Sequence, residues 1–537
     1  MGIPYYFYVI ARSYDGIILR AWPKHLTCAH FFLDFNGLMH PASQAYLKTV
    51  VAPIDAAKLE KGIITSIWTE LQTAIQLVKP TRTVQVYIDG VAPIAKMFQQ
   101  RKRRYMSIFR KKLLNDYGLW DSNAISPGTT FMTRLHASLK AHIRYNKEPY
   151  EYYLSTAEEA GEGEHKLFER LKRLYNAPED VKIIHGMDAD LIMLSLLSHI
   201  PNIYLMREDA KTQENFYLDI HALRLGILKD LRIQYQWNMG SDVCKDPYSP
   251  EAQEIIETYV LLCTLLGNDF IPHPISFSLK KGGLEKILNL AKELWNDGLT
   301  LINLETHTIH WTFISKLLEQ ISKTENDDVY VAVKDYFHKK PRYETEEQRI
   351  ECYPTLSEYR DPLAFEMLYK IDARKWRLYY YKHLFHTRLN DTKVIMDSCH
   401  MYLQGILWTY HYYKGFHKDD RWYYPYSYSP TMRDLSNYLN SHINTFEGIQ
   451  SDWKKRAQAV YFTSSAAQLL SILPKESAHC VPPKVKDLLL GDARLQYLYP
   501  KEYPMQTFMK THLWECTPVL PPMNIAYVES LLPAPKK

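Results

Sequence analysis

The stretch "HFFLDFNG", residues 30–37, decides the fold, and it has a counterpart in "TVQVYIDG", residues 83–90. Each is a short run rich in β-branched and aromatic residues that reaches an aspartate and then a glycine. Such runs are typical of a buried strand followed by a tight turn. A third run of this kind opens "VKIIHGMDADLIML", residues 181–194. We therefore expect three strands, each followed by an acidic turn.

Helical patterns separate these strands, over residues 55–78, 94–117 and 164–176. Strands that alternate with helices indicate βαβ units and a largely parallel sheet. The predicted fold class is α/β, with a mostly parallel central sheet flanked by helices and an appended, mainly helical region rich in aromatic residues. The predicted domains are a core over 1–300, a variable connector over 301–362 and a helical block over 363–537 that packs on the core.

The composition is that of a globular protein, with 537 residues, 46% of them hydrophobic and 23% charged. The formal net charge is only +5, so any affinity for nucleic acid must come from local clusters of basic residues. Seven scattered cysteines indicate a reducing compartment rather than a disulfide framework. No membrane span or signal peptide is expected. We expect an intracellular protein.

Acidic residues gather at the predicted strand ends and glycine turns, including "AGEGEHKL", residues 160–167. Each acid alone is explained as well by a helix cap or a surface charge. Parallel strands, however, bring ligand sites to their carboxyl ends, and converging carboxylates repel one another unless hard cations such as Mg²⁺ or Mn²⁺ balance them. Two such ions can cleave a phosphodiester. The predicted metal ligands and catalytic residues are Asp34, Asp89, Glu162, Glu164, Asp188, Asp190 and Asp269.

A basic helix is predicted directly after Asp89, with eight Lys or Arg residues and no acid from 96 to 112. A charge run of this kind usually forms a solvated helix face. Here Lys96, Gln100, Arg103 and Arg104 fall at i, i+4, i+7 and i+8, on one stripe of the helix. Because the stripe lies beside the expected metal site, we favour a role in gripping a terminal phosphate, which Arg can bind through two hydrogen bonds.

Many of the 41 tyrosines crowd into residues 378–428. Two interpretations stay open for them. They form a helical core with hydroxyls near the surface, or a few of them form a platform on which unpaired bases stack.

Six motifs then occur in the order typical of one family. "DFNGLMH", "YIDGVAPIAKMFQQRKRRY", "DSNAISPGTTFM", "GEGEHKL", "GMDADLIML" and "GNDFIPH" resemble 5′→3′ exoribonucleases of the XRN type. The later "RWYYPYSYSP" and "LLSILP" resemble that family's second conserved block. The chain looks like a compact member without long C-terminal extensions, although "YYFYVIARSY" departs from the usual start.

The resemblance implies a core like that of PIN and flap nucleases and an activity on single-stranded RNA with a 5′-monophosphate. The seven acids match the family's ligands for two Mg²⁺ or Mn²⁺ ions, and Lys96, Gln100, Arg103 and Arg104 match its 5′-phosphate pocket. His40 and Trp422 match the pair that sandwiches the first base, as an alternative to a polar residue at a helix start and a core aromatic. The rival functions are a flap-type DNA endonuclease or a DNA/RNA 5′ exonuclease, and an inactive RNA-binding scaffold. Protein partners stay unknown. The resemblance to a compact member also implies a cytoplasmic rather than a nuclear protein, with a viral origin as one alternative.

Overall fold

The computed structural model describes residues 5–116, 118–145, 147–173, 177–209, 212–235, 244–369, 375–416, 421–455 and 463–532. Its contacts divide the chain into two compact units that interleave along the sequence. The unit that we name the sheet unit comprises Gly16–Ala222, Tyr461–Tyr503 and Leu520–Lys537. The unit that we name the helical unit comprises Met1–Asp15, Leu223–Val460 and Pro504–Val519. The domain boundaries expected at 300 and 362 stay a prediction.

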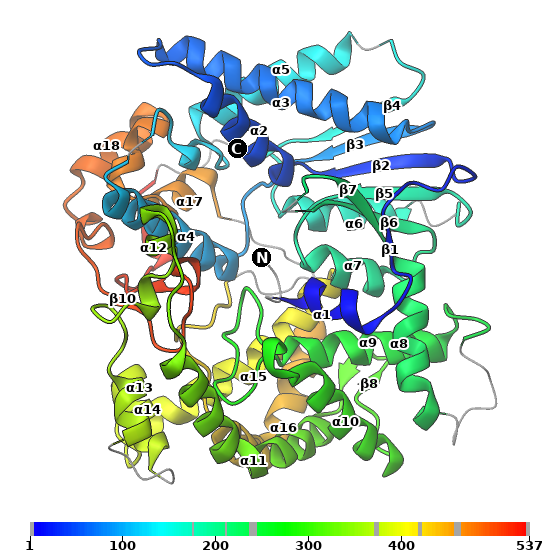
Figure 1. Ribbon diagram of the computed structural model, residues 1–537, viewed down its shortest axis with the longest axis vertical. Helices are drawn as coiled ribbons and strands as arrows, with labels where there is room; N and C mark the ends of the chain where they lie inside the picture. Colours follow the sequence, from blue (N-terminus) through cyan, green and yellow to red (C-terminus); the bar gives the residue numbers. More distant parts are fainter. Residues whose placement is uncertain are drawn as a thin grey trace. The chain divides into compact units, whose positions relative to one another are not determined.

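A seven-stranded sheet forms the centre of the sheet unit (Figure 1). Its order is β1-β7-β6-β5-β2-β3-β4. The run from β6 to β4 is parallel, while β7 and β1 add antiparallel pairs at one edge. The strands are β1 (Ile18–Leu19), β2 (Cys28–Asp34), β3 (Thr83–Tyr87), β4 (Glu151–Ser155), β5 (Val181–His185), β6 (Ile203–Glu208) and β7 (Asn215–Asp219). The mostly parallel sheet confirms the predicted fold class.

The order of the strands reverses between β2 and β5. From β2 the chain builds outward through β3 and β4, and then returns to add β5 and β6 on the other side of β2. Leu33 pairs with His185 of β5, and Asp34 pairs with Tyr87 of β3. The carboxyl ends of these three strands therefore meet at a switch point, the place where open α/β sheets bind ligands.

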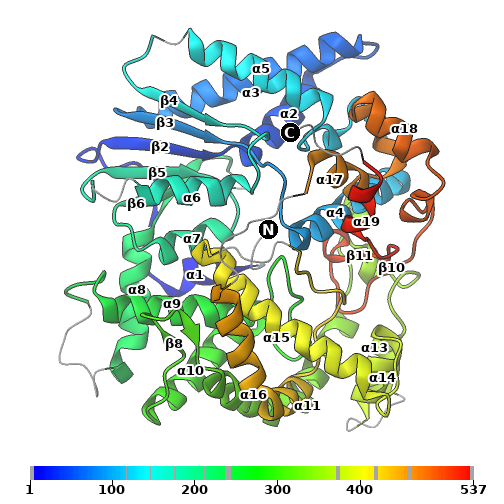
Figure 2. The same ribbon diagram turned by 180° about the vertical axis from the view of Figure 1, so that it is seen from behind.

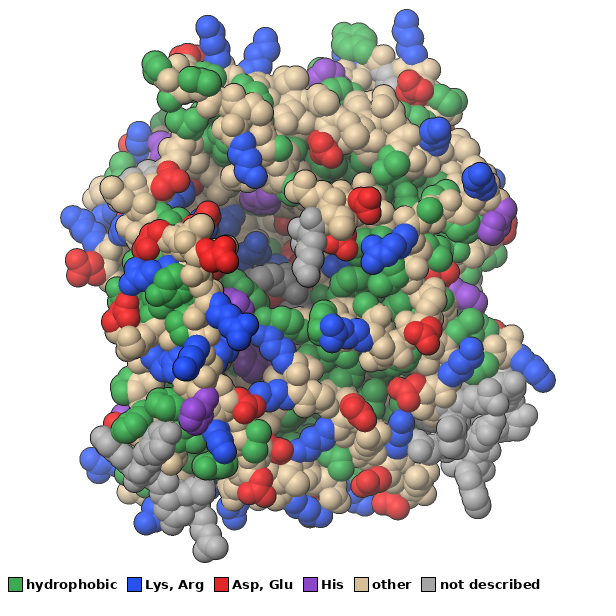
Figure 3. Space-filling model, in the orientation of Figure 1, with side chains coloured by type: hydrophobic (Ala, Val, Ile, Leu, Met, Phe, Trp, Pro, Cys, Tyr) green, Lys and Arg blue, Asp and Glu red, His purple; other side chains and the backbone are tan. Residues whose placement is uncertain are grey.

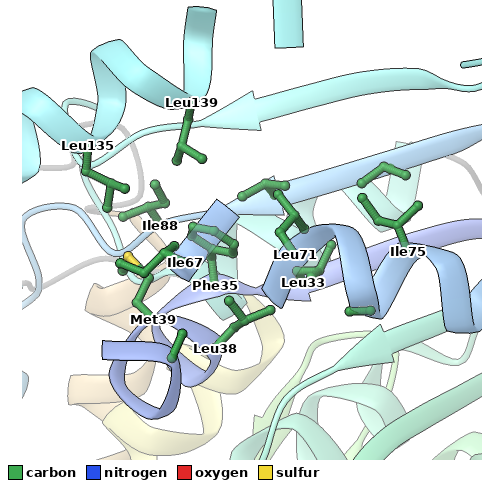
Figure 4. Close-up of a cluster of buried hydrophobic side chains, with 14 of the residues drawn as sticks. Leu33, Phe35, Leu38, Met39, Ile67, Leu71, Ile75, Ile88, Leu135 and Leu139 are labelled. Carbon is green, nitrogen blue, oxygen red and sulfur yellow. The ribbon is translucent and has the colours of Figure 1, made fainter. Parts of the chain in front are cut away.

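Helices cover both faces of this sheet (Figures 1 and 2). One face carries α2 (Phe35–Thr49), α3 (Ala56–Val78) and α5 (Thr130–Arg144), and the other carries α6 (Gly163–Arg173) and α7 (Asp190–Ser198). Figure 4 shows Leu33 of β2 among Leu71 and Ile75 of α3, within the buried core between strand and helix. This core fixes the strands and hence the loops at their carboxyl ends.

Helix α3 shows how the sequence specifies one of these elements. Asp55 begins it, because its carboxylate accepts hydrogen bonds from the backbone N–H groups of Ala57 and Lys58 at 3.0 and 3.1 Å. Leu59, Ile63, Ile67 and Leu71 then repeat every fourth residue and are all buried. The observed bounds agree with the predicted 55–78.

A second core joins α4 (Ile94–Leu114) to segments from the C-terminal part of the chain. Met97 of α4 packs in one buried cluster with residues of α17 (Ser465–Ile472), α18 (Pro483–Gly491) and α19 (Ile525–Ser530). Arg101 is buried and donates to the carbonyl oxygens of Leu498 and Pro521 at 2.7 and 2.6 Å. Contacts of Met97 and Arg101 with the C-terminal segments therefore hold the basic helix in place.

The helical unit is built from long helices with two short β-hairpins. Its hairpins are β8–β9 (Ile302–Asn303, Thr308–Ile309) and β10–β11 (Met505–Gln506, Thr517–Pro518). Its helices are α1 (Tyr6–Ser13), most of α8 (Ile220–Tyr235), α9 (Pro250–Thr264), α10 (Gly283–Asn296), α11 (Trp311–His338), α12 (Glu346–Glu351), α13 (Leu363–Tyr369), α14 (Trp376–Leu384), α15 (Thr392–Lys414) and α16 (Met432–Lys455). The expected connector 301–362 thus contains α11 and α12.

Four tyrosines of the aromatic-rich region form part of the helical unit's core. Tyr380, Tyr381, Tyr402 and Tyr410 are almost fully buried. Their hydroxyls donate hydrogen bonds to Ser429 O, Asp434 Oδ2, Pro272 O and Glu257 Oε2, at 2.7 to 3.0 Å. Buried rings with satisfied hydroxyls stabilise a core, so the core interpretation holds for these four.

Acidic and basic side chains both occur across the face drawn in Figure 3, in keeping with the small net charge. Within the residues that the structure describes, no helix is long and apolar enough to span a membrane.

Candidate metal centre

Six of the seven predicted acids belong to the sheet unit, and all six follow strands or begin helices. Asp34 ends β2, and Asp89 comes two residues after β3. Glu162 and Glu164 flank the first residue of α6, while Asp188 follows β5 and Asp190 begins α7. The switch point of the sheet gathers these loops at one edge.

The pKa shifts of Asp34 and Glu164 show that these acids interact electrostatically with one another. Burial raises the pKa of Asp34 well above its usual value, followed by the charges of Asp89 and Asp188. Burial likewise raises the pKa of Glu164, followed by the charge of Glu162, with smaller contributions from Asp190 and Asp188. A cluster that holds several carboxylates away from water requires positive charge to balance it.

Glycines allow the acidic loops to approach closely. A Cβ on Gly90 would lie 1.8 Å from the carbonyl oxygen of Glu159. Gly90 instead donates its N–H to Gly161 O at 2.9 Å, and Gly161 adopts a φ of +99° that favours glycine. Asp89 Oδ1 accepts the N–H of Gly163 at 2.6 Å, at the start of α6. The cap at this helix start is therefore Asp89, which leaves Glu162 and Glu164 available for another role.

Asn36 positions Asp89, a role that the sequence did not reveal. Its Nδ2 donates to Asp89 Oδ2 at 2.9 Å, and its Oδ1 accepts the backbone N–H of Asp89 at 3.1 Å. The first bond orients the carboxylate and the second holds the backbone of the same residue, as groups that orient metal ligands do. The only sequence signal was the place of Asn36 two residues after Asp34.

A half-buried cation, Lys166, and a buried one, Arg207, hold the backbone of the acidic loops. Lys166 Nζ donates to Ile88 O at 2.7 Å and to Thr156 O at 3.0 Å. Arg207 on β6 donates to Asp188 O at 3.1 Å. Burial is the main cause that lowers the pKa of Lys166 to about 8 and that of Arg207 to about 10. Lys166 belongs to a quoted motif, whereas nothing in the sequence singled out Arg207.

Lys96 joins the basic helix to the acids. Its Nζ lies 2.7 Å from Glu162 Oε1, and both side chains are at least nine-tenths buried. Its charge lowers the pKa of both Asp34 and Glu164 against the larger effect of burial. The first residue of the predicted phosphate stripe therefore contacts the acidic cluster in this structure.

The rest of the stripe follows along α4. Gln100 is buried and its Oε1 accepts from Gln468 Nε2 of α17 at 3.4 Å. Arg104 Nη2 donates to Ser126 Oγ at 2.6 Å, while Arg104 Nε is buried and has no hydrogen-bond partner among the described residues. Arg103 is exposed. A buried, unsatisfied donor on a cation suits an anionic ligand.

His40 lies close to this stripe. Its ring retains accessible surface, yet the surrounding protein atoms remove much of its hydration. This desolvation, followed by the positive charges of Arg103 and Arg104, lowers the pKa of the imidazole to about 4. The neutral form of His40 is therefore favoured beside the two arginines.

The two remaining predicted residues belong to the helical unit. Asp269 lies in a turn after α9, in which Asn268 Oδ1 accepts the N–H groups of Phe270 and Ile271 at 2.8 and 3.1 Å. Trp422 is 6% exposed and its ring stacks on Trp408, with centroids 5.2 Å apart. Their action together with residues of the sheet unit stays a prediction.

The donors of the cluster suit a divalent cation. One ligand atom each from Glu162, Glu164 and His165 lie within 4.8 Å of one another. Carboxylate oxygens are the ligands of Mg²⁺ and Mn²⁺, and an imidazole nitrogen is tolerated by Mn²⁺. The acidic residues of the sheet unit could therefore bind metal ions.

Comparisons with known proteins agree with these features. The family model for the XRN 5′-3′ exonuclease N-terminus matches residues 1–209, and the model for the Xrn1 helical domain matches residues 315–529. The 5′-3′ exoribonuclease 1 of Homo sapiens is 26% identical over 97% of this chain and 33% of its own length. The 5′-3′ exoribonuclease 2 of Gallus gallus is 23% identical over 97% of this chain and 68% of its own length. The chain thus spans about a third of the human relative.

Proposed function

Because the chain belongs to the XRN family, we propose that it is a metal-dependent 5′→3′ exoribonuclease. Its substrate is single-stranded RNA that carries a 5′-monophosphate, and its products are 5′-mononucleotides. The observation that carries this proposal is the link that α4 makes between the acids and the cationic stripe. Lys96 contacts Glu162, and Arg104 lies two helical turns further along the same helix.

The spacing along α4 supports cleavage one nucleotide from the 5′ end. The helix rises about 1.5 Å per residue, so Gln100 lies about 6 Å and Arg104 about 12 Å along the axis from Lys96. These distances from Lys96 are comparable to the length of one nucleotide and shorter than that of an oligonucleotide. A terminal phosphate on Gln100, Arg103 and Arg104 would thus leave the first internucleotide phosphate near the carboxylates.

Each group of residues has a distinct task in this proposal. The six acids of the sheet unit, with Asp269 as a predicted seventh, would hold two Mg²⁺ or Mn²⁺ ions. Such ions, when bound, supply the charge that activates water for attack and stabilises the leaving 3′ oxygen. Asn36 keeps the Asp89 carboxylate in one orientation.

Recognition of the 5′ end depends on the stripe and on stacking. Arg104 Nε would donate to the terminal phosphate, while Ser126 keeps the guanidinium in place. Neutral His40 would stack on the first base without regard to its identity, with Trp422 as its predicted partner. A pocket for one phosphate and one base excludes caps, triphosphates and duplex ends. A cytoplasmic site of action stays a prediction.

The decisive experiment compares matched RNA and DNA strands that carry a 5′-phosphate, hydroxyl, triphosphate or cap. We expect rapid stepwise release of mononucleotides only from RNA with a 5′-phosphate, and only with Mg²⁺ or Mn²⁺. Preferred cleavage of DNA flaps would instead favour the endonuclease alternative. Binding without cleavage of any substrate would favour the inactive scaffold.

The variants Asp188→Ala and Asp190→Ala test the metal site separately. Each should abolish hydrolysis and leave RNA binding largely intact, because metal ligands act mainly on the transition state. Activity within tenfold of wild type in both variants would contradict the assignment.

A further inference from the structure

A second group of metal-ligating side chains lies in the sheet unit and shares no residue with the acidic cluster. Asp121 and Cys480 are buried, and His479 is exposed. One ligand atom from each lies within 4.8 Å of the other two. The carboxylate, imidazole and thiol come from chain segments about 360 residues apart, so the fold and not a local motif assembles them.

The distances suit a tetrahedral ion. Asp121 Oδ2 lies 3.8 Å from Cys480 Sγ and 3.9 Å from His479 Nε2. Ligand bonds of about 2.0 Å to oxygen or nitrogen and about 2.3 Å to sulfur give ligand-to-ligand distances of roughly 3.3–3.7 Å in a tetrahedron. The oxygen–sulfur pair would have to contract by about 0.3 Å and the oxygen–nitrogen pair by about 0.6 Å to reach tetrahedral spacing, while the nitrogen–sulfur pair lies within 4.8 Å.

The two oxygens of Asp121 have separate partners. Oδ1 accepts the backbone N–H of Asn123 at 3.1 Å and lies 3.5 Å from Lys111 Nζ. Oδ2 is the oxygen that faces His479 and Cys480. The carboxylate is therefore oriented from behind, as ligating carboxylates usually are.

The hydrogen bond of His479 determines which ring nitrogen is available. Nδ1 lies 3.1 Å from Glu476 O. A carbonyl oxygen only accepts, so Nδ1 carries the proton and a neutral ring presents the lone pair of Nε2. That lone pair faces Asp121 Oδ2, which is also an acceptor. Histidines that bind metals typically donate their second nitrogen to a carbonyl in this way.

We propose that Asp121, His479 and Cys480 bind one Zn²⁺ ion, with water as the fourth ligand. Thiolate, imidazole and carboxylate are the common ligands of zinc, whereas Mg²⁺ takes oxygen ligands. In the metal-free protein the Cys480 thiol donates to Asp121 Oδ2, and burial and then the Asp121 carboxylate raise the pKa of this thiol. Zn²⁺ would therefore displace the thiol proton to solvent when it binds the thiolate.

A zinc ion at this site would link the segment that contains Asp121 to the segment that contains His479 and Cys480, which are already in contact. Asn123 Nδ2 donates to Ser477 Oγ at 2.9 Å across the same two segments. The segment that begins at Asp121 also contains Ser126, the acceptor for Arg104. The ion would therefore stabilise the segment from Asp121 to Ser126, which positions Arg104 in the proposed 5′-phosphate site.

The test uses cobalt as a spectroscopic probe for zinc in the full chain. With Mg²⁺ in excess to occupy the carboxylates, Co²⁺ should give a near-ultraviolet charge-transfer band that requires a thiolate ligand. The band should vanish in Cys480→Ser and persist in Cys352→Ser, a matched control whose thiol instead donates to Arg342 O. No band in wild type, or an unchanged band in Cys480→Ser, would overturn the proposal.

His479→Gln gives a second test that does not disturb the core, because His479 is exposed. Competition with a chromophoric chelator should show that this variant binds Zn²⁺ at least about tenfold more weakly than wild type. An unchanged zinc affinity would also overturn the proposal. Neither readout depends on nuclease activity.

Discussion

Lys96 Nζ lies 2.7 Å from Glu162 Oε1, so one buried cation of α4 balances part of the acidic cluster. We expect Lys96→Met to lower the free energy of unfolding of the metal-free protein by about 3–5 kcal/mol, because buried carboxylates lose their counter-charge. Chemical denaturation in EDTA measures this effect.

Lys112→Met is the matched control for this change. Lys112 forms an exposed ion pair with Glu476 at 3.4 Å, and such pairs contribute at most about 1 kcal/mol. Equal losses in Lys96→Met and Lys112→Met would show that Lys96 does not balance the cluster.

Asp34→Asn should stabilise the metal-free protein at neutral pH while it abolishes activity. The pKa of Asp34 is raised in the folded state above its ordinary value of 3.8, so the folded protein binds more protons than the unfolded chain as the pH rises. Stability from this group therefore falls as the pH rises above about 4. The difference in free energy of unfolding between Asp34→Asn and wild type should therefore increase with pH. It should decrease when Mg²⁺ is added. An advantage that is the same at pH 5 and pH 8 would contradict this origin.

Arg103→Ala combined with Arg104→Ala should erase the preference for a 5′-phosphate and not the chemistry. Two lost charge-assisted hydrogen bonds of about 1.5–3 kcal/mol each would lower kcat/KM for phosphorylated RNA on the order of a hundredfold or more. RNA with a 5′-hydroxyl makes no such contacts and should barely change. The ratio of the two rates at fixed salt is the measurement.

Ser126→Ala is a milder change at the same place, because it leaves both arginines and removes the acceptor for Arg104 Nη2, together with the hydrogen bond that Ser126 Oγ donates to Asn123 O. Ser126→Ala should also reduce the preference for RNA with a 5′-phosphate over RNA with a 5′-hydroxyl, by a smaller factor than the double arginine variant. If both substrates lose rate equally in the Arg103 and Arg104 variant, the stripe is a general RNA-binding surface.

Asn36→Ala should raise the Mg²⁺ concentration needed for half-maximal activity by about 10–100-fold, as losses of groups that orient metal ligands do. The reason is that Asp89 loses the hydrogen bond from Asn36 Nδ2 to its Oδ2, together with the one that its own backbone N–H donates to Asn36 Oδ1. Titration of activity with Mg²⁺ measures the shift, with Asn390→Ala on the surface as the control. A lower maximal rate with an unchanged metal requirement would assign Asn36 a different role.

The sequence by itself determined the elements that carry the site. Short runs of β-branched and aromatic residues specify the strands that end at Asp34 and shortly before Asp89, and apolar residues at every fourth position from Leu59 onward specify α3. Helix α4 was predicted over 94–117 and ends at Leu114, because Asn115 adopts the left-handed conformation. Such features depend on neighbours within one or two turns, which a sequence displays directly.

The tertiary structure alone decided which side chains meet. Asn36 reaches Asp89 across 53 residues, and Arg104 finds Ser126 on a separate segment. Residues after 460 return to pack against α4, so the units interleave and do not follow the sequence. These contacts depend on strand order and on the exact approach of backbones, such as that of Gly90 to Glu159. The local spacing of apolar residues predicts neither the strand order nor these close backbone approaches. It determines the secondary structure of each segment and not its tertiary contacts.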